Sequence, residues 1–173
     1  ELAFAALHCQ QLGIAHVVID LGFMAQHFKS SLLEGADAIP EADYAEDNIK
    51  STVVPFRNGI MLSIAAGLAN SRGLKGVMIA NHGGDPDCRP GFISAMDAAI
   101  SAGTDAEVCV FAPYTGLSKS DIAKIGAELG LDYSLTWSCY KGQETHCGVC
   151  ATCRERKQAM ADAGIHDNTV YQA

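Results

Sequence analysis

The sequence is poor in positive charge. It has 12 lysines and arginines against 20 aspartates and glutamates, which gives a formal net charge of −8. Proteins that bind nucleic acid usually present a basic surface to the phosphate backbone, so this balance argues against nucleic acid as a partner. We expect the partners of this chain to be small molecules.

Long hydrophobic runs and an export signal are also lacking. No uninterrupted apolar run approaches the roughly 20 residues that a membrane helix needs. The first residues, ELAFAALHCQQLG, have no initiator methionine, no basic start and no small-residue cleavage site of a secretory signal. We therefore expect a soluble cytoplasmic protein with no membrane partner.

A framework of disulfides is not indicated either. The chain has seven cysteines, an odd number, and three of them (Cys9, Cys88 and Cys109) lie in or beside segments with a regular pattern. Without a sign of secretion, the count favours reduced thiols in a cytosolic protein.

What the sequence does contain is an alternation of short apolar segments with helical patterns. Strands are predicted at residues 14–21, 75–81 and 106–113. Helices are predicted at about residues 2–12, 56–73, 90–103, 118–130 and 150–163. This alternation predicts a doubly wound α/β domain, in which helices cover both faces of a parallel sheet. Residues 22–50, which are polar and acidic around Pro40, predict a long surface excursion.

Two of the predicted helices carry an apolar stripe that should face the core. The stripe of the 56–73 helix consists of Ile60, Met61, Ile64, Ala65, Leu68 and Ala69. The stripe of the 118–130 helix consists of Ile122, Ile125 and Leu129. In the second helix Ser118 precedes Asp121 by three residues, which is the spacing of a helix cap.

Four cysteines gather in the stretch CYKGQETHCGVCATC, separated by seven, two and two residues. Two-residue gaps let successive turns direct sulfur atoms at one ion, and the longer loop returns a fourth ligand, so the spacing favours a closed, structural zinc site. Buried packing, a redox dithiol, disulfides and an iron–sulfur cluster are the alternatives. His146, which lies beside Cys147, could replace a cysteine as a ligand, but four thiolates already fill the coordination sphere of zinc. The proposed ligands are Cys139, Cys147, Cys150 and Cys153.

Two short segments have the character of an anion site. Arg57 and Asn58 fall in the first turn of a predicted helix, where unpaired backbone amides and the helix dipole attract phosphate. Lys119 occupies the same position in a later helix. A solvated arginine, an ordinary asparagine cap and a surface lysine are the alternatives, and the residues alone do not decide between them.

A dense polar turn, NHGGDPDCRPG, follows the strand at 75–81. In parallel sheets ligands bind at the carboxyl ends of the strands, and Asp85, Asp87 and Arg89 offer groups for an amine, a metal or a carboxylate. The alternative is a polar turn that caps the next helix. Cys88 could serve as a nucleophile, although a single cysteine more often packs than reacts.

In four stretches the chain resembles the 7-cyano-7-deazaguanine synthase (QueC) family of the PP-loop ATP pyrophosphatase superfamily. They are VVPFRNGIMLSIAAGLA, PDCRPGFISAM, LSKSDIAKIGAELG and TWSCYKGQETHCGVCATCRERKQA. The resemblance implies a carbon–nitrogen ligase of queuosine biosynthesis that converts 7-carboxy-7-deazaguanine and ammonia to 7-cyano-7-deazaguanine with ATP and Mg²⁺. It also implies one structural zinc on the four cysteines and a homodimer.

The resemblance assigns roles to the polar residues. Arg57 and Lys119 would be catalytic, and together with Asn58 they would contact ATP. Asp85, Asp87 and Arg89 would contact the deazaguanine substrate. The alternatives are a PP-loop enzyme that thiolates or amidates tRNA and a zinc-stabilised binding module without catalysis.

Two departures accompany the resemblance. The SGGxDS phosphate loop of the superfamily is absent, and we expect the native protein to carry it upstream of residue 1. The turn GGDPDCR is shorter between Asp85 and Pro86 than the family pattern. The predicted domains are residues 1–135, a PP-loop α/β domain without its first strand and phosphate loop, and residues 136–173, a four-cysteine zinc element with a helix.

Overall fold

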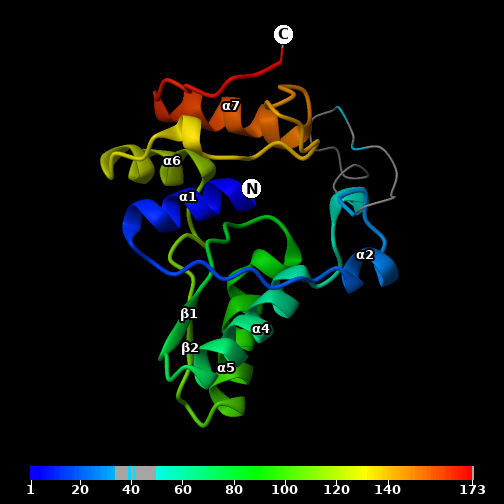
Figure 1. Cartoon of the computed structure of the whole chain (residues 1–173), viewed down its shortest axis with the longest axis vertical. Coiled ribbons are helices and arrows are strands. Elements are labelled where there is room, and N and C mark those ends of the chain that lie inside the picture. The colour runs from blue at the N-terminus through cyan, green and yellow to red at the C-terminus, as the bar shows by residue number, and fades with distance from the viewer. Residues whose placement is uncertain (34–38, 40, 42–49, 173) are drawn as a thin grey trace. The chain divides into compact units, whose positions relative to one another are not determined.

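The computed structural model describes residues 1–33, 39, 41 and 50–172. The chain divides into two compact units, one formed by residues 1–55 and 123–173 and the other by residues 56–122. Figure 1 shows the elements of both. The functional boundary predicted between residues 135 and 136 stays a prediction.

The unit of residues 56–122 is a small α/β arrangement that follows the predicted order of helices and strands. Its elements are α4 (Arg57–Ser71), β1 (Gly76–Met78), the 3-10 turn η1 (Pro86–Cys88), α5 (Pro90–Gly103), β2 (Cys109–Phe111) and the start of α6 (Lys119–Glu128). The bounds of α5 agree with the prediction, because Pro90 presets the first helical turn and Gly103 ends the apolar pattern.

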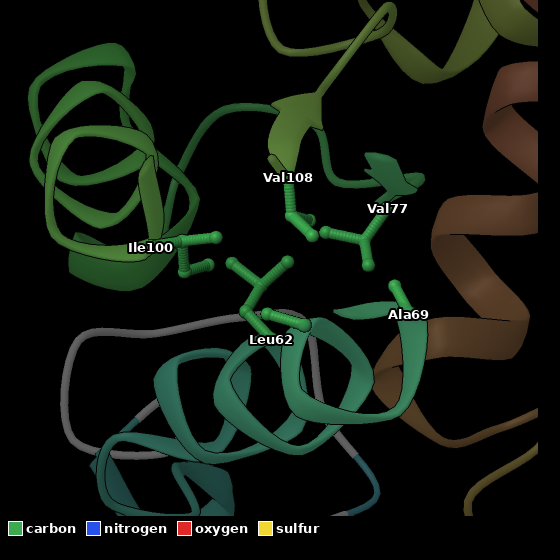
Figure 2. Close-up of a cluster of buried hydrophobic side chains, with 6 residues drawn as sticks. Leu62, Ala69, Val77, Ile100 and Val108 are labelled. Atoms are coloured by element: carbon green, nitrogen blue, oxygen red, sulfur yellow. The ribbon is translucent and has the colours of Figure 1, made fainter. Parts of the chain in front are cut away.

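The two strands pair in parallel, with Val77 opposite Val110. Helix α4 packs on β1 and α5 packs on β2, and the two helices also touch each other. Their buried side chains meet in one cluster, which Figure 2 shows pointing inward from both helices and both strand segments. The cluster consists of Leu62, Ala66, Ala69, Val77, Ile100 and Val108. Burying an aliphatic side chain of this kind stabilises a fold by roughly 1.5–3 kcal/mol.

The other face of the sheet is exposed. Met78 and Phe111, which alternate with the inward-facing Val77 and Val110, are 72% and 53% exposed. Among the described residues, the sheet therefore has two strands and one covered face. The second layer of helices that a doubly wound domain requires is not seen there, so that part of the predicted fold stays a prediction.

The buried face of helix α4 agrees in part with the predicted stripe. Ala69 is buried and Ala65 packs against the core, as predicted. Met61, also predicted in the stripe, is 50% exposed, whereas Leu62 and Ala66, which were not predicted, are buried. The helix is apolar on nearly all sides, so periodicity alone could not select the face.

The stretch Lys50–Ser71 is long and apolar enough to cross a membrane by length and composition, a test that core helices also pass.

The unit of residues 1–55 and 123–173 is mainly helical. Its elements are α1 (Leu2–Leu12), α2 (Phe23–His27), the rest of α6, the 3-10 turn η2 (Tyr133–Leu135) and α7 (Ala151–Ala163). Gly13 ends α1 in the left-handed region with φ 66°, as its place after the last apolar residue predicted.

The strand predicted at residues 14–21 is wrong for this structure. The segment forms no helix or strand, and Ile14, Val18 and Ile19 are 46–59% exposed. A strand needs a neighbouring strand to pair its backbone, and β1 and β2 pair with each other.

Leu129, expected in the stripe of α6, lies beyond the end of that helix and is 79% exposed. Of the excursion predicted at residues 22–50, residues 34–38, 40 and 42–49 lie outside the described residues.

Candidate active site and metal centre

The four clustered cysteines come together in space. Their sulfur atoms all lie within 4.8 Å of one another, and Cys150 and Cys153 have no exposed surface. Cys150 ends the loop as the residue before α7, so Cys153 lies one turn further along the helix, on the same side. None of the four is in a disulfide, so the disulfide alternative is not what the structure has.

The donor set fits a tetrahedral thiolate site for a metal ion. Four sulfurs at the roughly 2.3 Å bond length of zinc would lie about 3.8 Å apart, and the sulfurs of Cys147 and Cys153 are 4.0 Å apart. Backbone amides also point at the sulfurs, since the amide of Cys150 donates to Cys147 Sγ at 3.3 Å. Such hydrogen bonds stabilise the negative charge that ligating thiolates carry.

The thiols of this cluster have unequal acidities. Burial raises the pKa of Cys153, and the thiols of Cys150 and Cys139 raise it further. Burial acts the same way on Cys150, but hydrogen bonds from Thr152 and from backbone amides outweigh it and lower its pKa to about 6. A buried group of mixed thiol and thiolate is poorly solvated, and a bound cation would neutralise it.

His146 is buried beside the cluster but serves as packing. Its Nε2 atom accepts a hydrogen bond from the amide of Ser138 at 3.2 Å. Its ring lies 4.3 Å from that of Trp137 and 5.7 Å from that of Tyr171, measured between centroids. The cysteines alone form the metal-ligating group found among the described residues.

The chain after α7 packs against the cysteine cluster and bonds to the segments around it. The backbone of His146 pairs with Tyr171 in an isolated parallel bridge, and the Tyr171 ring packs against the cysteines. Arg156 of α7 holds Asp167 by a buried ion pair of 3.2 Å. Arg156 also donates to Thr136 and to the carbonyl of Tyr133, at 2.8 Å each. One guanidinium therefore joins three segments around the cluster.

A second polar cluster lies in the unit of residues 56–122, where α4 begins and β1 and β2 end. Asp87 of η1 accepts a hydrogen bond from the backbone amide of Asn58 at 3.1 Å. The side-chain nitrogen of Asn58 donates to the Asp87 carbonyl oxygen and to Cys88 Sγ, at 3.2 Å each. Asp87 therefore supplies the cap of α4 that the helix lacks within its own sequence.

Asn81 and Thr115 link the same turn to the end of β2. Asn81 follows β1, is 5% exposed, and donates its side-chain nitrogen to the Cys88 carbonyl oxygen at 2.7 Å. Thr115 follows β2, and its hydroxyl lies within donating distance of both Asn81 Oδ1 and the Ala112 carbonyl oxygen, at 3.2 Å each. The carboxyl ends of both strands and the amino end of α4 thus meet at one edge of the sheet, which is where α/β folds bind ligands.

Of the charged residues predicted for the site, Arg57, Asp85, Asp87 and Arg89 belong to the segments that meet at this edge. Arg57 is the first residue of α4 and is exposed. Asp85 and Arg89 flank η1 and are exposed, and Arg89 Nε donates to the Gly84 carbonyl oxygen at 3.4 Å. Lys119 is the first residue of α6, a few residues after Thr115.

The helix that carries Lys119 begins with the predicted cap. The amide of Asp121 donates to Ser118 Oγ at 3.2 Å, and the amide of Ser118 donates back to Asp121 Oδ2 at 3.1 Å. This reciprocal pair fixes where α6 starts and so fixes the backbone of Lys119.

Cys88 has the environment of a packed thiol. Burial raises its pKa, and the carboxylates of Asp87 and Asp85 raise it further. A thiol that stays protonated at neutral pH is a poor nucleophile, so its surroundings favour the packing alternative over a covalent role.

Sequence reasoning missed the residues that connect the site. Asn81 was recognised as part of the polar turn but given no role, and Thr115, Arg156 and Asp167 were given none. The partners by which they join other segments lie 7 to 34 residues away in the sequence. The one local signal was the position of Asn81, a polar residue at the end of a buried strand.

Comparison with known proteins identifies the family. The family described as queuosine biosynthesis protein QueC matches residues 1–164. A Porphyromonas gingivalis protein named 7-cyano-7-deazaguanine synthase is 58% identical over 99% of this chain and 80% of its own length. Proteins of the same name from Desulfotalea psychrophila and Rhizobium rhizogenes are 47% and 45% identical over 99% of this chain, and over 80% and 75% of their own lengths. The chain belongs to the QueC family of queuosine biosynthesis proteins.

Proposed function

We propose that the chain is the ATP-dependent ligase that converts 7-carboxy-7-deazaguanine and ammonia to 7-cyano-7-deazaguanine in queuosine biosynthesis. The observation that carries the proposal is the 58% identity to a synthase of that name over 99% of this chain. The polar edge of the sheet supports it, because the residues gathered there suit phosphate and carboxylate groups. The proposed setting is a doubly wound PP-loop fold in a cytoplasmic homodimer.

The chemistry explains why ATP and cationic side chains are needed. Ammonia does not displace a carboxylate oxygen until that oxygen is made a good leaving group, so the carboxylate first attacks ATP and releases pyrophosphate. Ammonia then displaces AMP to give an amide. Loss of the amide oxygen needs a second activation by ATP, after which AMP and a proton leave and the nitrile forms.

Arg57 and Lys119 are the proposed catalytic residues. Both begin helices, so their charges add to the positive ends of α4 and α6. Cations at these positions would stabilise the negative charge that grows on the phosphates during each activation, with Mg²⁺ on ATP. Removing one such group from an active site typically lowers kcat by roughly a hundredfold to a thousandfold.

Asp85 and Arg89 are the proposed substrate contacts. Arg89 can hold a carboxylate by two parallel hydrogen bonds, and Asp85 can accept from the amine groups of the deazaguanine ring. Asn58 and Asp87 were expected to contact ATP and substrate. Their described hydrogen bonds instead join them to each other and to Cys88, which favours a supporting role.

The four cysteines are the proposed ligands of one structural zinc ion. Bound zinc supplies folding free energy and ties the loop from Cys139 to Cys153 to α7. Four thiolates leave no position for water or substrate, so the ion has no part in the reaction. Three observations support this assignment: the four sulfurs lie close together, backbone amides donate to them, and none of the four is in a disulfide.

The test is ATP consumption by the intact protein. We expect AMP and pyrophosphate to form when both 7-carboxy-7-deazaguanine and ammonium are present, and not when either is left out. Transfer RNA should not replace the deazaguanine acid. ATP use that depends on tRNA would favour the thiolating or amidating relatives, and zinc-loaded protein that consumes no ATP would favour a binding module.

A further inference from the structure

Two buried asparagines bond the turn around η1. Asn81 donates to the carbonyl oxygen of Cys88 at 2.7 Å. Asn58 donates to the carbonyl oxygen of Asp87 and to the sulfur of Cys88. They are 5% and 9% exposed. Their side-chain nitrogens therefore donate to groups of the turn inside the protein.

We infer that Asn81 is a positioning residue of the substrate site, which fixes the turn between Asp85 and Arg89 through Cys88. The inference rests on the proposed function, and it assigns a role to a residue that the proposed chemistry does not use. Thr115 completes it, because its hydroxyl lies 3.2 Å from both Asn81 Oδ1 and the Ala112 carbonyl oxygen, and sharing its hydrogen with Asn81 sets which way the amide points.

The bonding of Asn81 requires an amide. One end of its side chain must donate, to the Cys88 carbonyl, and the other must accept, from Thr115. A carboxylate of the same shape can accept from Thr115 but would face the Cys88 carbonyl with a negative oxygen. In a buried place such a mismatch is costly, because neither oxygen can turn to water.

The consequence for function follows from what the turn carries. Asp85 lies directly before η1 and Arg89 directly after it, both exposed, so their backbone positions depend on how firmly the turn is held. Substrate groups misplaced by about an ångström can lose on the order of a hundredfold in rate. The proposed phosphate contacts, Arg57 and Lys119, lie on α4 and α6. Asn58 ties the start of α4 to Asp87 by bonds that do not involve Asn81, so we expect Arg57 to keep its place when Asn81 is changed.

The test uses the intact, zinc-loaded protein with Asn81→Asp, Thr115→Val and Thr115→Ser. We expect Asn81→Asp to raise the KM for 7-carboxy-7-deazaguanine by about tenfold or more, with the KM for ATP changed by less than about twofold. Thr115→Val should have the same effect to a smaller degree. Thr115→Ser keeps the hydroxyl and should behave as wild type.

A second measurement follows the turn itself. Hydrogen–deuterium exchange should be faster at residues 85–89 in Asn81→Asp by about tenfold, and unchanged in the core of α5. Equal rises in both KM values together with a lower Tm would reduce Asn81 to a general structural role and overturn the inference. Unchanged hydrogen–deuterium exchange at residues 85–89 in Asn81→Asp would also overturn the inference. Wild-type protein that makes no nitrile would defeat the proposed function, whereas the exchange result would still decide whether Asn81 holds the turn.

Discussion

The buried ion pair between Arg156 and Asp167 should contribute measurably to the free energy of unfolding. Its side chains are 9% and 12% exposed. Burial raises the pKa of Asp167, but hydrogen bonds from Arg156, Tyr171 and Thr169 outweigh it and lower the pKa to about 2 from an ordinary 3.8. A difference of that size corresponds to about 2 kcal/mol of stabilisation at neutral pH. We expect Asp167→Asn to destabilise the protein by about 2–5 kcal/mol, the upper end because Arg156 is left buried and unpaired.

The sign of the pH dependence follows from the direction of the shift. Because folding lowers the pKa of Asp167, its contribution is present above about pH 4 and is lost as the pH falls from there towards 2. The gap in unfolding free energy between wild type and Asp167→Asn should narrow over that window. Metal loss in acid affects both proteins, so the gap isolates the carboxylate.

The assay is urea unfolding at pH 7, with Arg156→Gln and the double variant to complete a mutant cycle. We expect a coupling free energy of about 2 kcal/mol. Asp162→Asn is the matched control, because Asp162 lies in α7 with Arg156, is exposed and accepts a hydrogen bond from Gln158. This change should alter the free energy of unfolding by less than about 0.5 kcal/mol. A coupling below about 0.5 kcal/mol would refute the reasoning.

Three further predictions follow from the core, the metal centre and the polar edge. Gly59→Ala should destabilise the protein by about 1–3 kcal/mol in thermal unfolding, because a Cβ there would lie 2.3 Å from the Phe56 ring. Gly67→Ala, in the same helix with nothing within 4 Å, should instead stabilise it by about 0.5–1 kcal/mol. Cys153→Ser should lower the zinc content measured by elemental analysis from about one ion per chain and reduce helicity by circular dichroism; full zinc occupancy in this variant would contradict the four-thiolate site. Arg57→Ala should lower kcat by roughly a hundredfold in steady-state assays with zinc content unchanged, and wild-type kcat would contradict the proposed catalytic role of Arg57.

The parts of the fold that local signals determine could be predicted. Helix α5 runs from Pro90 to Gly103, and each end has a residue whose backbone chemistry sets it. The cap of α6 at Ser118 was visible for the same reason, since both partners lie within one turn. The cysteine cluster was visible because ligand spacing is itself a local pattern.

The parts that depend on distant partners could not be predicted. Residues 14–21 have the composition of a strand, but a strand exists only where another pairs with it. The buried face of α4 is centred on Leu62 and not on Met61, because the packing of β1 and α5 chooses among its apolar sides. The bond of Asn58 to Asp87 spans 29 residues, so no local pattern in the sequence could indicate it.

The central claim is that this chain builds a nitrile from a carboxylate. The most direct measurement is mass spectrometry of the product when the intact, zinc-loaded protein acts on 7-carboxy-7-deazaguanine with Mg²⁺, ATP and isotopically labelled ammonium. The account predicts 7-cyano-7-deazaguanine with the label in its nitrile nitrogen and a matching release of AMP. Unchanged acid, under conditions in which the protein holds its metal and binds ATP, would contradict it.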